Sequence, residues 1–266
     1  MDDNYQTYLN RVARTTLPET YQTQVQHVQE SSKFCLTPNG ERKAAAFPGY
    51  TLITPPSGEE SQNSSFYAQI QLYQEELLKL AVDHDLSDLI VALPTSSFHM
   101  TIADLIWDSA YHHACDRNPH FESDLQSCCG KIFQQYHQNP NFPPGENRWN
   151  ILGIMIMPRA IGISLVPKNQ ASYEQIIQLR RKIYQNPQLI SLGIEQQYHY
   201  TAHITLAYFG QPKPDWKRDR FADTMTEFNQ KWLTDTPDFT INRVELRKFD
   251  DMTRYYRQPN WAAIDF

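Results

Sequence analysis

HMTIA at residues 99–103 and HITLA at residues 203–207 are two copies of one pattern, His-apolar-Thr-apolar-Ala. Side chains alternate between the two faces of a β-strand, so the His, Thr and Ala of each copy are expected to share one face. The apolar residues of each copy then point to the other face, where a core would bury them. Each copy therefore predicts a strand that presents an imidazole and a hydroxyl side by side, next to a small alanine.

The shared context distinguishes this duplication from coincidence. Two His-x-Thr matches are by themselves not rare in a chain of this composition. A common five-residue context on two expected strands, about a hundred residues apart, is far less frequent. We therefore interpret the repeat as functional, rather than as two ordinary buried strands whose histidines are satisfied by their neighbours.

Composition limits the class of protein. The chain of 266 residues is long enough for one large domain or two packed lobes, and 12% of its residues are aromatic. The net charge of −6 argues against strong non-specific binding to nucleic acid, but it allows a local basic cleft for one phosphate. The N-terminus lacks an apolar signal core, and the longest apolar run, residues 151–157, is too short to span a bilayer. We expect a cytoplasmic protein without a membrane partner.

The sequence does not indicate a metal site or a disulfide framework. Its cysteines form no C-x-x-C pair, and two of them, Cys128 and Cys129, are adjacent. His112, Cys115 and His120 lie close together but fit no common ligand spacing, and neither does the neighbouring His113. We predict no metal here, and an irregular loop where residues 108–120 lie.

Apolar periodicity predicts a series of strands and helices. Residues 1–30 are expected to form a helix on the surface, residues 34–49 a loop with short extended pieces, and residues 139–145 a break. Ser172 and Gln175 suggest a capping box at the start of a helix. We expect strands at residues 50–54, 89–93, 97–107, 151–157, 161–166, 198–209 and 239–249, and helices at residues 66–80, 121–137, 172–184 and 221–232.

The order of these elements is similar in the two halves of the sequence: strand, helix, His-x-Thr strand, helix, strand. This order predicts an α+β fold of two pseudo-symmetric lobes, each an antiparallel sheet with outer helices. One His-x-Thr strand from each lobe would face a central cleft. We expect an N-terminal extension at residues 1–49 and a bilobal domain at residues 50–266. Its lobes would cover about 50–150 and 151–266, with strands able to exchange between them.

Two imidazoles and two hydroxyls in one cleft suit phosphodiester cleavage without a metal ion. A neutral histidine can take a proton from an attacking oxygen while a protonated one gives a proton to the leaving oxygen. The ordinary imidazole pKa, near 6.5, lets both states exist close to neutral pH. Threonine hydroxyls can donate to the non-bridging phosphate oxygens. The chain has no G-x-S-x-G, Walker loop or G-x-G-x-x-G, which argues against the nucleophile and nucleotide-loop alternatives.

SFHMT at residues 97–101 and HITLAY at residues 203–208 resemble the two motifs of the two-histidine (2H, LigT-like) phosphoesterase superfamily, in a less-studied branch. The resemblance implies that His99 and His203 are the acid-base pair, that Thr101 and Thr205 bind the phosphate, and that no cofactor is needed. It also implies a nucleotide or RNA-end substrate, first of all a 2′,3′-cyclic phosphate. Other members of the superfamily join RNA halves through 2′-5′ bonds, trim RNA 3′ ends or open cyclic oligonucleotides.

Two other classes of function stay open at this point. One is a module that binds a nucleotide without turning it over, but binding alone does not require two acid-base groups. The other is a metal-dependent hydrolase with His99 and His203 as ligands. Such a hydrolase would need acidic partners, and Asp104 has the wrong strand parity to join Thr101.

Further residues are candidates for the walls of the cleft. An arginine or lysine would help to hold a phosphate, and an aromatic side chain would stack on a base. Tyr208 has the opposite parity from His203, so it joins the cleft only if its strand bulges. The candidates are Tyr50, Ser97, Arg159, Lys168, His199, Thr201 and Tyr208.

Overall fold

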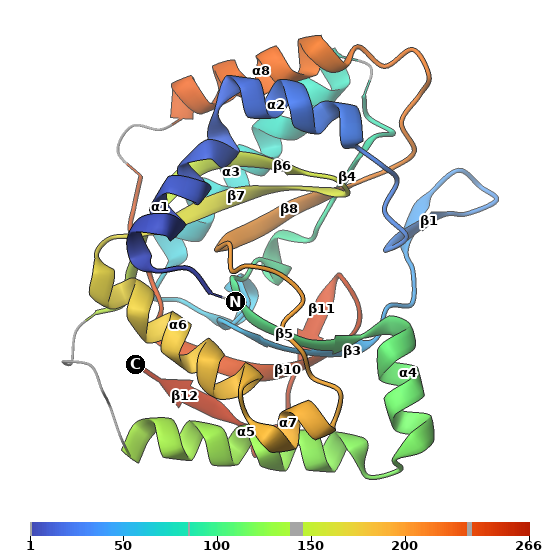
Figure 1. Cartoon of the computed structure of the whole chain (residues 1–266). Helices are drawn as coiled ribbons and strands as arrows, with labels where there is room; N and C mark the ends of the chain where they lie inside the picture. Colours follow the sequence, from blue (N-terminus) through green and yellow to red (C-terminus); the bar gives the residue numbers. More distant parts are fainter. Residues whose placement is uncertain (1, 85, 139–145, 233–235) are drawn as a thin grey trace.

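The computed structural model describes residues 2–84, 86–138, 146–232 and 236–266. Two five-stranded sheets face each other in the interior, and helices cover their outer sides (Figure 1). The strand pairs of both sheets are antiparallel. The predicted α+β fold with antiparallel sheets is therefore confirmed.

The lower sheet of Figure 1 has the strand order β11-β10-β3-β5, and β12 also pairs with β10. The upper sheet has the order β4-β8-β7-β6-β9. A separate hairpin, β1-β2, lies beside them. The strands are β1 (Phe34–Leu36), β2 (Arg42–Ala44), β3 (Gly49–Ile53), β4 (Ile90–Ala92), β5 (Thr101–Trp107), β6 (Arg148–Met157), β7 (Ala160–Pro167), β8 (His203–Phe209), β9 (Phe239–Thr240), β10 (Arg243–Asp251), β11 (Arg254–Tyr256) and β12 (Ala263–Asp265).

Helices α2, α3 and α8 lie over the upper sheet, and α5 and α6 lie over the lower one (Figure 1). Their buried faces have the apolar spacing of three and four residues that the sequence predicted, as in α3, where Phe66, Ile70 and Leu77 are buried. The helices are α1 (Tyr5–Ala13), α2 (Pro18–Gln24), α3 (Ser64–Asp83), α4 (Asp108–Arg117), α5 (Phe121–Gln138), α6 (Gln170–Tyr184), α7 (Pro187–Ser191) and α8 (Arg218–Trp232).

Each sheet contains strands from both halves of the sequence. Strand β4 comes from the first half of the sequence but pairs with β8, and the Leu93 amide after it donates to the Leu206 carbonyl. Strands β10, β11 and β12 return from the second half to pair in the lower sheet. Neither half of the sequence therefore supplies all the strands of one sheet.

The N-terminal region packs into the core, although the sequence predicted a helix on the surface. It forms two helices, α1 and α2, whose Tyr8 and Tyr21 side chains are fully buried. The Tyr8 hydroxyl donates to the Leu165 carbonyl (3.2 Å), and the Tyr21 hydroxyl donates to the Ile154 carbonyl (2.5 Å). These bonds satisfy backbone oxygens of the upper sheet, so the region is part of the fold.

Other expectations need correction. Residues 108–117 form helix α4 in place of a loop, and the turn into it puts Asp108 at a φ of 51°. Helix α6 begins after Asn169, whose side chain accepts from the Ser172 amide, so the predicted capping box is not its start. The strand expected at residues 239–249 divides into β9 and β10. The break expected at residues 139–145 lies outside the described residues.

Most of the other expected elements lie within a few residues of their predicted positions. The expected strands at 50–54, 89–93, 151–157 and 161–166 correspond to β3, β4, β6 and β7, and the helices at 66–80, 121–137 and 221–232 correspond to α3, α5 and α8.

Across the part of the chain that the structure describes, no helix has the length and apolar character needed to cross a membrane.

Candidate active site

The two motif histidines are held by the same local contact. The Nδ1 of His99 lies 2.7 Å from the Ser97 carbonyl oxygen, and the Nδ1 of His203 lies 2.8 Å from the Thr201 carbonyl oxygen. A carbonyl oxygen only accepts, so Nδ1 is the nitrogen that carries the proton in both neutral rings. The Nε2 of each ring is thereby left with a lone pair that can take a proton.

Both strands begin later in the chain than predicted, so that His203 is the first residue of its strand and His99 precedes its strand by two residues. Residues 95–97 form a 3₁₀ turn after Pro94, and β5 begins only at Thr101. The segment before β8 is not a strand either, and β8 begins at His203 itself. These irregular segments turn the carbonyls of Ser97 and Thr201 toward the rings that follow two residues later.

Helix α1 holds the segment in front of His203. The guanidinium of Arg11 donates to the Thr201 hydroxyl (2.7 Å) and to the Tyr200 carbonyl (2.5 Å). Asp3 accepts from the Arg11 Nε at 2.8 Å. The N-terminal region therefore fixes the backbone that orients His203.

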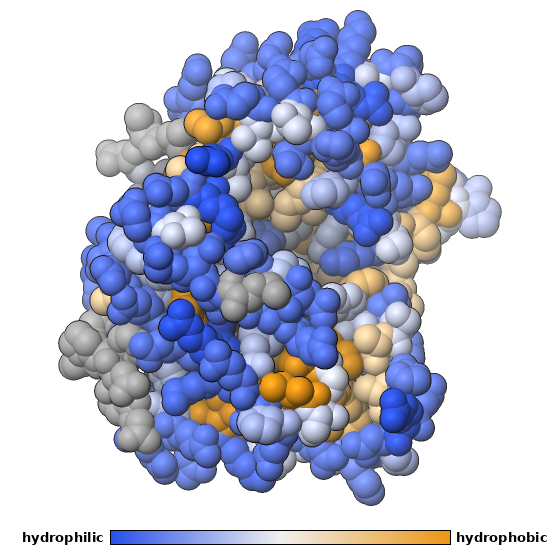
Figure 2. Space-filling model, viewed as in Figure 1, coloured by the Kyte–Doolittle hydropathy of each residue, from blue (hydrophilic) through white to orange (hydrophobic). Residues whose placement is uncertain are grey.

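One cavity of about 740 Å³ is lined by His99, Thr101, His203 and Thr205. A hollow with pale and orange, less hydrophilic side chains at its walls is visible between the two halves of the molecule (Figure 2). Within the described residues, the hydroxyls of Thr101 and Thr205 have no hydrogen-bond partner. Both hydroxyls are therefore available to donate to a ligand.

A bulge in β5 places Asp104 in this cavity. Ile53 of β3 lies opposite Thr101, but Thr51 lies opposite Asp104, so three residues of β5 span two residues of β3. Asp104 and Thr101 both line the cavity, whereas Ala103 is fully buried. The predicted strand parity, which put Ala103 beside Thr101 and excluded Asp104, is therefore wrong in this strand.

A second bulge does the same for Tyr208 in β8. Gly162 of β7 lies opposite Thr205, and the next residue, Ile161, lies opposite Ala207. Gly162 allows this close approach, because a Cβ there would be 2.7 Å from the Ile204 carbonyl oxygen. Tyr208 consequently lines the cavity with His203, the condition on which its candidacy depended.

Burial lowers the pKa of both histidines, but their neighbours differ. The pKa of His99 falls to about 4, chiefly because burial disfavours the charged ring, against the opposing bond to Ser97 and with repulsion from His203 and Arg247. Burial also lowers the pKa of His203, and the bond to Thr201 and the charge of Asp104 oppose that fall. Burial raises the pKa of Asp104 itself, against the attraction of nearby Lys33.

Lys33 adds a cation to the cavity wall. Its Nζ lies 4.9 Å from the ring centres of Phe47 and of Tyr208, and it donates to the Tyr208 hydroxyl at 3.3 Å. It precedes β1 in a polar stretch that carries no motif, so no sequence signal pointed to it. Only the packing of the β1-β2 region beside β8 brings it to the site.

The other candidate residues separate into two groups. Ser97, Arg159 and Tyr208 line the cavity. Four others do not line it and have partners elsewhere: Tyr50 bonds Gln126 (3.2 Å), Lys168 pairs with Asp238 (2.5 Å), His199 pairs with Asp3 (3.5 Å), and Thr201 accepts from Arg11 (2.7 Å). In the ranges that the structure describes, no group of three or more His, Cys, Asp or Glu side chains could hold a metal ion.

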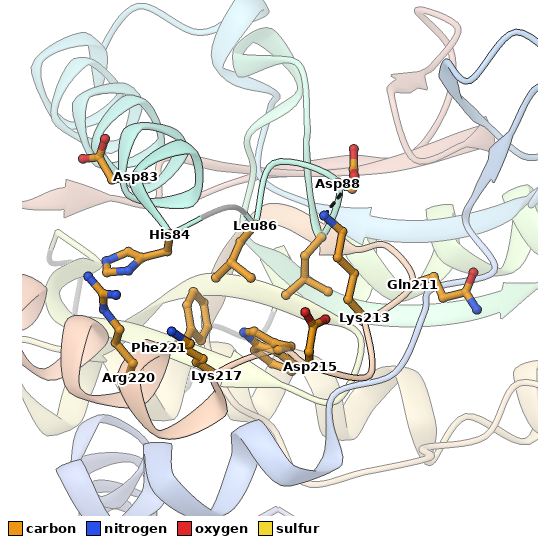
Figure 3. Close-up of a pocket in the computed structure, with 12 residues that line it drawn as sticks. Asp83, His84, Leu86, Asp88, Gln211, Lys213, Asp215, Lys217, Arg220 and Phe221 are labelled. Atoms are coloured by element: carbon orange, nitrogen blue, oxygen red, sulfur yellow. Dashed lines mark ion pairs between the residues drawn. The ribbon is translucent and has the colours of Figure 1, made fainter.

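A second cavity, of about 380 Å³, lies between the end of α3 and the start of α8. Its wall carries side chains of both charges, among them Asp83, Lys217 and Arg220, and Asp88 pairs with Lys213 at 3.6 Å (Figure 3). None of the four motif residues lines it. The chemistry that the motifs supply therefore belongs to the larger cavity.

Part of the chain matches a known protein family. Residues 33–138 match the family described as 2H-phosphodiest, a domain of unknown function (DUF1868). This match includes His99 and Thr101 and ends before the second motif. No curated protein matches the chain in sequence.

Solved structures are similar to the chain at low sequence identity. A conserved protein of unknown function from Agrobacterium tumefaciens is 15% identical over 86% of this chain and 90% of its own, with a TM-score of 0.56. LigT of E. coli complexed with 3′-AMP is 12% identical over 83% and 98% of the two chains, with a TM-score of 0.39. A phosphoesterase is 14% identical over 82% and 99%, with a TM-score of 0.41.

Proposed function

We propose, starting from the match of residues 33–138 to the 2H-phosphodiest family, that the chain hydrolyses phosphodiesters of nucleotides or RNA ends without a metal ion. A 2′,3′-cyclic phosphate is the substrate that we put first. The observation that carries the proposal is the matched pair of histidines. Two imidazoles, one just before β5 and one at the start of β8 in the other sheet, line one cavity, and the Nδ1 of each lies against a carbonyl oxygen two residues earlier.

We further propose that the two sheets belong to two pseudo-symmetric lobes of one bilobal domain, residues 50–266. The similar placement of the two motifs supports this division, since Thr101 begins β5 in one sheet and His203 begins β8 in the other. The lobes about 50–150 and 151–266 exchange β4 and β10. Residues 1–49 act as a supporting extension, because Arg11 holds the segment before His203 and Lys33 reaches the cavity.

The proposed reaction places the phosphorus between the two imidazoles. The hydroxyls of Thr101 and Thr205 donate to non-bridging oxygens, and Lys33 offsets their negative charge. One histidine takes a proton from water as the water oxygen attacks phosphorus. The bond from phosphorus to the leaving oxygen breaks, and the other histidine gives that oxygen its proton.

The remaining wall of the cavity suits a nucleotide. Phe47, Trp107 and Phe249 line it beside the polar groups. An aromatic side chain stacks on a base with about 1–3 kcal/mol and little sequence preference. This combination of phosphate donors and rings favours a nucleotide or RNA end over a small alkyl phosphodiester.

A substrate screen tests this function. Nucleoside 2′,3′-cyclic phosphates, 2′-5′ and 3′-5′ dinucleotides and cyclic oligonucleotides are incubated with the protein in EDTA, and the products are identified. The matched control is the double variant His99→Ala, His203→Ala. We expect hydrolysis of a cyclic phosphate by the native protein and none by the control. Binding without turnover would instead indicate a nucleotide-binding module, and equal turnover by both proteins would contradict the proposal.

A further inference from the structure

The two histidines of the cavity have unequal electrostatic surroundings. His203 of β8 is faced by Asp104 of β5, by Lys33 and by His99. His99 is faced by His203, by Arg247 of β10, and by the Tyr255 ring of β11, whose centre is 4.3 Å from its own. Among the described residues, a carboxylate acts on His203 and none acts on His99.

Asp104 owes its place to the bulge in β5. The extra residue turns its side chain to the face that Thr101 occupies, with Thr51 of β3 directly opposite. Lys33, Arg180 of α6 and, when it is protonated, His203 each favour the charged form of this carboxyl. Asp104 lines the cavity with both histidines, and its charge opposes the fall in the pKa of His203 but is not among the causes that shift the pKa of His99.

The charge of Arg247, which acts on His99, does not change this asymmetry. Arg247 is already paired with Glu59 at 2.7 Å and with Glu245 at 2.5 Å. Those two carboxylates form ion pairs with Arg247, and neither is among the causes that shift the pKa of His99. A charged His99 would thus be buried without a counterion, while a charged His203 would have Asp104.

We propose that Asp104 divides the work of the two histidines, so that His203 is the general acid and His99 is the general base. This inference rests on the proposed function and adds the direction of proton flow. His99 Nε2 takes the proton from the attacking water, and the water oxygen forms the bond to phosphorus. The bond from phosphorus to the leaving oxygen breaks, and the Nε2 proton of His203 moves to that oxygen. Solvent exchange then restores both rings.

The chemistry of this assignment is consistent with the causes that shift the pKa of each histidine. The base must be neutral, and His99 is the ring whose pKa lies at about 4. The acid must be charged, and Asp104 opposes the fall in the pKa of His203. The rate should then rise with pH as His99 loses its proton and fall as His203 loses its own. Asp104 is a positioning residue here, since it acts through His203.

The test is the pH profile of kcat/KM for the native protein, Asp104→Asn and Asp104→Glu. Asn keeps the shape and removes the charge, so the descending limb should move to lower pH while the ascending limb stays in place. In Asp104→Glu, which keeps the charge, the descending limb should lie closer to its position in the native protein. The matched control is Asp108→Asn, which removes another cavity-lining carboxylate and should leave both limbs in place. An unmoved descending limb, or a moved ascending limb, would overturn the proposal.

Two further measurements separate this proposal from the proposed function. In ¹⁵N-histidine spectra, the titration midpoint of His203 should be lower in Asp104→Asn than in the native protein, whatever the substrate. An unchanged midpoint overturns the role of Asp104 alone. On a substrate whose leaving oxygen is replaced by sulfur, which departs without a proton, His203→Ala should regain most of its loss and His99→Ala should not. Equal behaviour of the two variants overturns the assignment, and no turnover by the native protein overturns the proposed function.

Discussion

At the scale of single residues, the site depends on which ring nitrogen of each histidine carries the proton and on the position of the two threonine hydroxyls. The carbonyls of Ser97 and Thr201 fix which ring nitrogen of each histidine is free. Thr101 and Thr205 offer hydroxyls without a partner in the described part of the chain, on the same cavity wall. The sequence predicted that all four motif residues would meet in one cleft, because their pattern is local and occurs twice, and all four line this cavity.

The threonine hydroxyls supply the first prediction. If each donates to a non-bridging oxygen, Thr205→Val should lower kcat/KM by about 10²- to 10³-fold, the usual worth of one such donor. The fold should persist, because valine is nearly isosteric and suits a strand. Thr205→Ser is the matched control, since it keeps the hydroxyl. Unchanged kcat/KM in the valine variant would remove the role of this hydroxyl.

The lowered pKa of His99 predicts how stability varies with pH. In the unfolded chain this ring binds a proton near its ordinary pKa of 6.5, whereas in the folded chain it binds one only near pH 4. The contribution of His99 to stability is therefore complete above pH 6.5 and is lost as the pH falls toward 4. Urea unfolding of the native protein and of His99→Gln from pH 7 to 4 measures this. A parallel decline in the two proteins would contradict it.

At the scale of elements, strand irregularities decide which side chains reach the cavity. The bulges in β5 and β8 bring in Asp104 and Tyr208 and bury Ala103 and Ala207. A sequence pattern predicts strict alternation of side chains along a strand. It does not predict a bulge, because a bulge depends on the pairing with the partner strand. For the same reason Lys33 could not be predicted, since its position depends on packing against β8.

Helix α1 leads to a prediction at this scale. Arg11 touches the backbone before His203 and not the cavity. Arg11→Met should release that segment and lower kcat by up to about 10²-fold, the cost of a small misplacement of a reacting group. Arg14→Met, one turn further along the chain and exposed, is the matched control. Equal kcat in the two variants would show that α1 does not position His203.

At the scale of the whole molecule, the exchanged strands join both halves of the chain into one structure. Strand β4 belongs to the sheet of the second half, and β10 belongs to the sheet of the first. The sequence predicted two sheets with outer helices but could not assign these strands, since pairing partners over such distances leave no local pattern. The cavity lies where the two sheets meet, so both must fold for either motif to work.

This interdependence predicts a single unfolding transition. Trp107 reports on the lower sheet and Trp149 on the upper one. In urea, tryptophan fluorescence of Trp107→Phe and of Trp149→Phe should give midpoints that coincide with far-ultraviolet circular dichroism of the same variant. Two separated transitions would indicate lobes that fold independently.

The central claim is that His99 and His203 act together on one phosphorus centre. Its most direct test is a double-mutant cycle on the best substrate in EDTA, comparing the native protein, His99→Ala, His203→Ala and the double variant. Each single change should lower kcat by about 10²- to 10⁴-fold. The double change should cost less than the product of the two single losses, because the histidines act as a unit. Full activity in either single variant, or fully multiplicative losses, would contradict the account.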